Sequence, residues 1–167
     1  MIRLNPVQHS PTFARLHRAE IRQPIAVITF SRGSINFSWE LEMNQYNRDS
    51  WFRDYRVPLM PTPNPPDDSV PAGTLRLSEL PVQEIVDAVN AANLGVNSFI
   101  CFAGDGGGFL SEFAAYHGVW YQNIHDQPGH PAWCIAGGQL HVGSLIDWDI
   151  AERAAAGGMG PLPRPTG

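Results

Sequence analysis

Lysine is absent from this chain of 167 residues, so all eleven basic residues are arginine, against sixteen acidic residues. Charged residues make up 16% of the sequence, which is below the usual share of about a quarter. No segment is densely basic, and a nucleic-acid partner is therefore not expected. The arginine-only pattern fits a GC-rich genome, selection against lysine tagging, or a need for forked donors at interfaces, and the sequence does not separate these explanations.

Long apolar runs and paired cysteines are also missing. No stretch approaches the length of a membrane span, and the first twenty residues lack the apolar centre of a secretory leader. We therefore expect no membrane partner, and an intracellular or virion-associated protein. The two cysteines, Cys101 and Cys134, form no C-x-x-C pair, which excludes a zinc knuckle or redox motif of that type. Their apolar surroundings indicate separate buried thiols, with one disulfide as the alternative outside the cell.

Proline and glycine are plentiful and clustered, with 15 and 16 copies. The clusters fall in 58–71 and 157–167, which cannot be the interior of a helix or strand. The sequence predicts an N-terminal arm over 1–10, one α+β domain over 11–156 with a proline-rich loop at 58–71, and a C-terminal tail over 157–167. Fixing each backbone residue costs about 1–2 kcal/mol of conformational free energy. These three segments have little side-chain surface to offset that cost within their own domain, so we expect them to contact other chains.

Hydrophobic periodicity predicts a compact α+β fold with a mostly antiparallel sheet and two or three helices. The best helix is 81–94, where Val82, Ile85, Val86 and Val89 follow the helical period and Gly95 suits a C-cap. A hairpin is expected from 25–30 and 35–43, and a turn at Gly137-Gly138. The remaining expected elements are a helical turn at 109–116, strands at 97–103, 119–124, 132–136 and 139–142, and a last helix at 145–156.

The strand predicted at 35–43 alternates strictly between apolar and polar residues. We expect one face to point to the core and Glu40 and Glu42 to face water on the other. The core-facing residues would be Ile35, Phe37, Trp39, Leu41 and Met43.

A glycine-rich stretch, "GDGGG" at 104–108, follows an apolar run and suggests a phosphate-binding loop. A P-loop needs a lysine, which the chain lacks. The dinucleotide fingerprint fails because Phe109 stands at its last glycine position. We therefore predict a turn with at least one residue at positive φ, no bound nucleotide and no cofactor.

Histidine, cysteine and aspartate gather in "HDQPGHPAWC" at 125–134. A metal site would draw its ligands from His125, His130, Cys134 and His141, although no established zinc spacing matches. The alternative is histidines in turns. A nucleophile would require Cys101 or Cys134 beside a histidine and an acid such as Asp126 or Asp147, with buried core thiols as the alternative.

Aromatic residues beside arginine are typical of protein interfaces. Such a group lies at 48–56, and the two arms each add one arginine. The candidate interface residues are Arg3, Arg48, Trp51, Phe52, Arg53, Arg56 and Arg164. Residues 1–60 carry eight arginines against five acids, whereas 61–167 carry three against eleven. This asymmetry favours association with other protein chains, including copies of the same chain.

These observations together favour a non-enzymatic structural or accessory subunit of a multi-chain assembly, in the form of a phage or virus-like particle component. The first alternative is a small enzyme or enzyme subunit, a hydrolase or a metal-dependent enzyme, that uses the region from His117 to His141 with Cys134. The second alternative is a secreted toxin or effector, for which the lack of lysine is the only indication.

Overall fold

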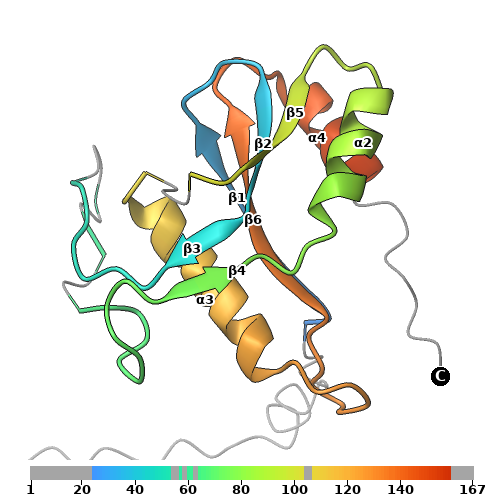
Figure 1. Cartoon of the computed structure of the whole chain (residues 1–167). Helices are drawn as coiled ribbons and strands as arrows, with labels where there is room; N and C mark the ends of the chain where they lie inside the picture. The colour runs from blue at the N-terminus through green and yellow to red at the C-terminus, as the bar shows by residue number, and fades with distance from the viewer. Residues whose placement is uncertain (1–23, 54–56, 58–59, 62–63, 104–106, 159–167) are drawn as a thin grey trace, which may run out of the picture.

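The computed structural model describes residues 24–53, 57, 60–61, 64–103 and 107–158 (Figure 1). These residues form the predicted α+β domain, in which three helices accompany a mixed four-stranded sheet and a small two-stranded sheet. In chain order the elements are β1 (Ala26–Gly33), β2 (Ser38–Glu42), β3 (Asn44–Tyr46), β4 (Leu75–Leu77), α2 (Val82–Ala91), β5 (Asn97–Cys101), α3 (Leu110–Ile124), β6 (Ala136–Gly143) and α4 (Trp148–Gly158).

The main sheet has the strand order β1-β6-β2-β5. β1 runs parallel to β6 and β2 runs parallel to β5, while only the central β6–β2 pair is antiparallel. The expected antiparallel majority is therefore wrong, because helical crossovers such as α2 between β2 and β5 return the chain in the same direction. The predicted hairpin of 25–30 with 35–43 is also wrong, since β6 lies between these two strands.

β6 runs straight through Gly137 and Gly138, where a turn was predicted. The two glycines are required for close packing rather than for a change of direction. A Cβ on Gly137 would lie 2.7 Å from the carbonyl oxygen of Gly118 on α3, and a Cβ on Gly138 would lie 2.5 Å from a methyl carbon of Leu80. The pair therefore lets the chain pack tightly on both faces of the strand.

α3 is one helix of 15 residues, where a helical turn and a separate strand at 119–124 were predicted. The β-branched and aromatic residues near its end favour a strand locally, but packing of the helix on the sheet overrides that preference. Gly107 and Gly108 precede α3 with φ values of 89° and 66°, which confirms the predicted turn. Residues 104–106 of the glycine-rich stretch lie outside the described residues.

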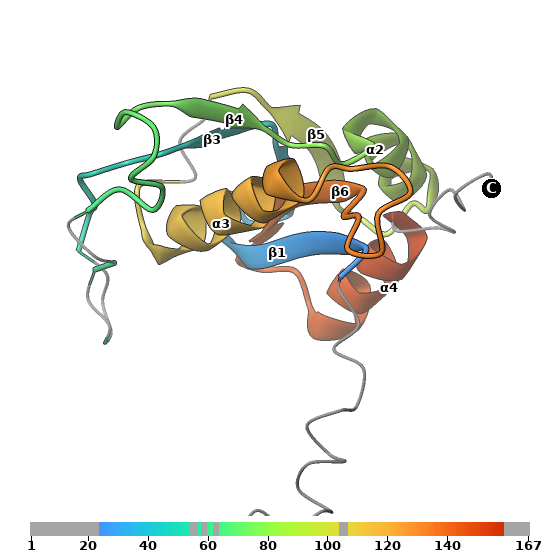
Figure 2. The ribbon, with the colours of Figure 1, turned by 90° about the horizontal axis from the view of Figure 1, so that it is seen from below.

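The helices cover opposite faces of the main sheet, α3 on one side and α2 with α4 on the other (Figures 1 and 2). The apolar core lies under α2 and α4, where the side chains of Trp39, Leu41 and Leu140 are buried. α2 confirms the predicted helix, with Ile85, Val86 and Val89 buried, Val82 half-buried and Gly95 at φ 76°. α4 begins three residues later than predicted, at Trp148.

The alternation along β2 is confirmed, but its consequence for burial is not. Trp39 and Leu41 are 1% and 0% exposed, as expected. Glu40 and Glu42 are also buried, at 7% and 3% exposed. They share the face of the sheet on which α3 packs over β6 and β1, so this face does not meet water as expected. Ile35 and Phe37 lie before the strand and are about half exposed, so they are not core residues.

The small sheet of β3 and β4 is held against α3 by a buried polar network. Asp67 accepts hydrogen bonds from the backbone and hydroxyl of Ser69 and forms a 2.8 Å ion pair with Arg76. Arg76 in turn donates to the hydroxyl of Tyr116 on α3.

Among the described residues, no helix is long and apolar enough to cross a membrane.

Candidate functional site

The face of the sheet beneath α3 carries a buried polar cluster. β2 contributes Glu40 and Glu42, and β6 contributes Gln139 and His141. In the antiparallel register Glu40 lies opposite His141 and Glu42 lies opposite Gln139, so all four side chains project from one face. Glycines on α3 and β6 let the helix approach this face closely.

A hydrogen-bonded pair of carboxylate and imidazole forms the centre of the cluster. His141 Nδ1 lies 2.8 Å from Glu42 Oε1, and both side chains are buried. Because a carboxylate oxygen only accepts, the ring proton is on Nδ1 and is donated to Glu42. The other ring nitrogen, Nε2, lies 3.3 Å from the amide nitrogen of Gln139, which also donates to the Ser31 hydroxyl at 2.8 Å. This arrangement leaves the lone pair on Nε2 of a neutral imidazole.

Cys101 lies at the edge of the cluster, opposite Glu42 in the parallel register of β2 and β5. Burial raises the pKa of its thiol, and the neighbouring carboxylates of Glu42 and Glu40 raise it further. The thiol therefore stays protonated at neutral pH, which weakens it as a nucleophile. Both cysteines are free, as predicted, and Cys134 is a buried core thiol whose pKa is also raised by burial.

The first turn of α3 carries a serine and a buried glutamate. Ser111 is half-buried and precedes Gly118 by seven residues, which places both on the side of α3 that faces the sheet. The next residue, Glu112, is fully buried and accepts a 2.6 Å hydrogen bond from Arg48 and a 2.9 Å bond from the Gly108 backbone. These two contacts fix the start of the helix.

The structure separates the histidines that were predicted as a metal site. His125 lies at the C-terminal end of α3, where its Nδ1 contacts the Tyr121 carbonyl at 2.8 Å. His130 is exposed in the following loop. Among the described residues, His141 is grouped with Glu40 and Glu42 as potential metal ligands, not with His125, His130 or Cys134.

The predicted interface residues have mixed surroundings. Arg48 pairs with Glu112, and Trp51 packs edge-on against Phe113 of α3. Phe52 is 68% exposed and Arg53 is exposed. An interface at these residues stays a prediction, and Arg3, Arg56 and Arg164 lie outside the described residues.

Sequence reasoning missed the pairing of Glu42 with His141. Each residue was singled out separately, Glu42 as a solvated acid and His141 as a metal ligand. The signal that joins them is the register of β2 with β6, two strands separated by about a hundred positions. Ser111 carried no local signal.

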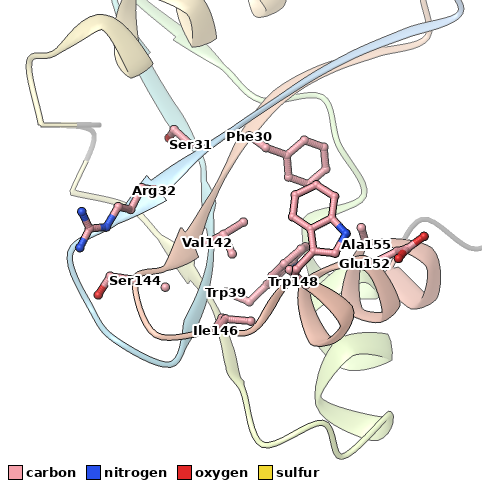
Figure 3. Close-up of a pocket in the computed structure, with 12 residues that line it drawn as sticks. Phe30, Ser31, Arg32, Trp39, Val142, Ser144, Ile146, Trp148, Glu152 and Ala155 are labelled. Atoms are coloured by element: carbon pink, nitrogen blue, oxygen red, sulfur yellow. The ribbon is translucent and has the colours of Figure 1, made fainter. Parts of the chain in front are cut away.

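A concavity lies on the opposite face of the sheet, between the sheet and α4 (Figure 3). It has a volume of about 690 Å³ and a mostly apolar wall, in which the ring centres of Phe30 and Trp39 are 6.1 Å apart. Trp148 from α4 points into it and is 84% exposed. The lining includes Arg32 and Glu152 but no histidine or cysteine, so this cleft lacks a carboxylate–imidazole pair like the one under α3.

No protein-family model matches the sequence. No curated protein matches it either. The fold, however, is similar to solved structures of pyrrolidone carboxyl peptidase from the hyperthermophile Pyrococcus furiosus. A mutant of that enzyme aligns with a TM-score of 0.61 at 16% identity, over 81% of this chain and 67% of that chain. The structure described together with its Cys-free mutant aligns with a TM-score of 0.62 at 14% identity and the same coverage.

This likeness establishes the fold and overturns the prediction of a non-enzymatic assembly subunit from a phage or virus-like particle, because the matching structures are those of an enzyme. The failed prediction depended on low charge, on proline- and glycine-rich arms and on the lack of a recognised motif. Those features describe surface and loops, whereas the polar cluster is buried between α3 and the sheet. The predicted alternative of a small hydrolase or metal-dependent enzyme agrees better with the fold.

Proposed function

We propose that this chain is a hydrolase that cleaves an amide or ester bond at a carbonyl carbon. Ser111 is the nucleophile, His141 is the general base, and Glu42 orients the imidazole and stabilises its charged form. The observation that carries the proposal is the buried 2.8 Å hydrogen bond between His141 Nδ1 and Glu42 Oε1. The fold supports it, since the similar solved structures are peptidases by name.

The protonation of the pair suits a base. With its proton on Nδ1 and directed to Glu42, His141 has its lone pair on Nε2, the nitrogen that would accept a proton from the nucleophile. In the structure Nε2 accepts from the Gln139 amide, 3.3 Å away. Gln139 must therefore turn away, or be displaced by substrate, before His141 can act.

Helix and strand geometry supports Ser111 as the nucleophile. α3 and β6 run in opposite directions, so the C-terminal end of α3 lies near the start of β6 (Figure 1). Gly118 of α3 packs beside Gly137 of β6. Seven residues of helix span about 10 Å, and four residues of strand span about 13 Å. Ser111 is seven residues before Gly118, and His141 is four residues beyond Gly137, so the two lie at similar heights along the sheet.

The reaction follows from these positions. The Ser111 oxygen attacks the carbonyl carbon while His141 Nε2 takes the hydroxyl proton, and the resulting imidazolium is stabilised by Glu42. The imidazolium then gives that proton to the departing amine or alcohol, which leaves an acyl group on Ser111. A water molecule, activated by the same nitrogen, releases the acid. Backbone N–H groups in the first turn of α3 would stabilise the negative carbonyl oxygen.

Cys101 is the competing nucleophile. Its register partner is Glu42, so it lies beside the carboxylate rather than beside Nε2 of His141. Its raised pKa opposes thiolate formation. Both facts favour the serine.

The proposal is tested with fluorogenic amides, including one of pyrrolidone carboxylic acid, and with activated acyl esters. Ser111→Ala and His141→Asn should each lower kcat/KM by about 10³-fold or more. Ser50→Ala and His130→Asn, which change exposed residues, should keep the wild-type rate. Far-UV circular dichroism checks that each variant is folded.

A fluorophosphonate probe supplies a second measurement that needs no known substrate. Mass spectrometry should find the label on Ser111 in the wild type and none in His141→Asn. Labelling elsewhere, or full activity of Ser111→Ala, would reject the serine. Loss of activity in Cys101→Ser alone would move the nucleophile to Cys101.

A further inference from the structure

Glu40, Glu42 and His141 offer three ligand atoms that all lie within 4.8 Å of one another. We infer that these residues form a binding site for one divalent transition-metal ion of the zinc type. This inference goes beyond the proposed hydrolysis, in which Glu40 has no role. It also differs from the metal site predicted from sequence, with which it shares only His141.

The charge of the cluster calls for a cation. Glu40 and Glu42 are both at least nine-tenths buried, and their side chains project from the same strand face. In the described part of the chain, the only basic side chain paired with either carboxylate is that of His141, which donates a hydrogen bond to Glu42 and carries charge only if protonated. Glu40 receives a hydrogen bond from the Ser38 hydroxyl, which carries no charge. Buried carboxylates are costly unless paired, and a divalent ion would compensate both.

Two buried oxygen atoms in the cluster have no hydrogen-bond partner. One is Glu42 Oε2, the oxygen that does not bond to His141. The other is Oε1 of Gln139, whose side chain is fully buried and whose amide nitrogen lies 3.3 Å from His141 Nε2. Buried polar atoms are seldom left without a partner. A metal ion would bind the free oxygen of Glu42, and a water molecule on that ion would donate to Gln139.

The donor set suits zinc. Two carboxylate oxygens and one imidazole nitrogen are three protein ligands, which leaves a fourth tetrahedral position for water. Because the ion would bind the free Oε2 of Glu42, the 2.8 Å hydrogen bond from His141 Nδ1 to Oε1 would open when Nδ1 turns to the ion. Two ligand atoms of a tetrahedral zinc ion are about 3.3 Å apart. If the ion binds at Nδ1, the ring proton moves from Nδ1 to Nε2, because a neutral imidazole keeps one proton when it binds a metal.

Such an ion would occupy the carboxylate and imidazole that the proposed reaction needs. Metal binding and hydrolysis would therefore compete for Glu42 and His141. The ion is then an inhibitor of the proposed reaction, and Glu40 is the residue that tunes its affinity.

The test is calorimetric titration of Zn²⁺ into the chelator-treated full-length protein. The wild type should bind one ion, and Glu40→Gln should weaken binding by about tenfold or more, with His141→Asn as a second ligand variant. Glu84→Gln, which changes an exposed carboxylate on α2, is the matched control and should keep the wild-type affinity. Circular dichroism verifies that each variant is folded.

Cobalt identifies the ligands independently. Co²⁺ in the wild type should give the visible absorption of a four-coordinate oxygen and nitrogen site, and Cys101→Ser should not change it. Equal Zn²⁺ affinity of wild type and Glu40→Gln, absence of binding, or a sulfur-to-cobalt charge-transfer band would each overturn the site. None of these measurements uses hydrolysis, so failure of the proposed reaction and failure of the metal site remain distinguishable.

Discussion

The two faces of the main sheet are built from the same strands yet differ in chemistry. Under α2 and α4 the face is apolar, with Trp39, Leu41 and Leu140 buried. Under α3 the same strands present the polar cluster of Glu40, Glu42, Gln139 and His141, which is equally buried. Burying apolar surface stabilises a fold, whereas burying carboxylates opposes it. Under the proposed function, the α3 face carries the reacting groups and the α2 face stabilises the fold.

Adjacent residues of β2 allow the sharpest contrast, because Leu41 and Glu42 project from opposite faces. Changing Leu41 should lower the free energy of unfolding, whereas changing Glu42 should lower kcat/KM.

Glu42→Gln should lower kcat/KM by roughly 10²–10⁴-fold, because the amide cannot stabilise the imidazolium and can hold His141 in the wrong tautomer. The free energy of unfolding should change by about 1 kcal/mol or less, since the buried charge is removed with little change of shape. Steady-state kinetics and a urea melt of the same protein provide both values. Unchanged kinetics would contradict the role of the pair.

Leu41→Ala should lower the free energy of unfolding by roughly 2–5 kcal/mol, because Leu41 is fully buried and its truncation leaves a cavity. The fraction that remains folded should keep kcat/KM near the wild-type value. Urea melts and kinetics well below the melting temperature separate the two effects. A Leu41→Ala protein that is stable but inactive would contradict the assignment of stability to one face and catalysis to the other.

The sequence was sufficient to predict the apolar face. α2 follows the helical period residue by residue, and the alternation of β2 correctly assigned Trp39 and Leu41 to one side. These signals are local, since each depends on a few neighbouring side chains. Phe37 shows the limit of these signals. The alternation in the sequence begins before β2 does, and Phe37, which precedes the strand, is exposed.

The polar face was not predictable, because it depends on tertiary contacts. Glu42 was expected to be solvated because the sequence did not show that α3 packs on that face of the sheet, and α3 itself was divided into a helical turn and a strand. His141 reaches Glu42 only because β6 lies between β1 and β2. The sequence did not indicate this strand order, because Gly137-Gly138 is a pair typical of turns and a turn was predicted there instead of a continuous β6.

Gly137→Ala tests the packing that brings α3 over the polar face. The added Cβ would lie 2.7 Å from the Gly118 carbonyl oxygen and 2.8 Å from the Gln122 Cβ. Backbone atoms cannot rotate away, so the helix or strand must shift, at a cost of about 1–3 kcal/mol. The shift should also reduce kcat/KM, since it moves Ser111 relative to His141. Gly157→Ala, where no atom lies within 4 Å of the added Cβ, is the control and should leave both quantities unchanged.

Asp67 is a buried carboxylate that, unlike Glu42, has partners for both oxygens, from Ser69 and Arg76. These partners lower its pKa below the ordinary value of 3.8, the hydrogen bond from the Ser69 side chain being the largest cause. Its contribution to stability is therefore complete above pH 3.8 and is lost as the pH falls through the lower pKa of the folded state. Asp67→Asn should cost about 1–2 kcal/mol at pH 7, because charge-assisted hydrogen bonds become neutral ones. The difference from wild type should shrink when urea melts are repeated at successively lower pH below 4, while kcat/KM at pH 7 stays near that of wild type. A difference that is constant down to the most acidic melt would mean that the charge of Asp67 contributes nothing, and a large loss of activity at pH 7 would place this network in the site rather than in the fold.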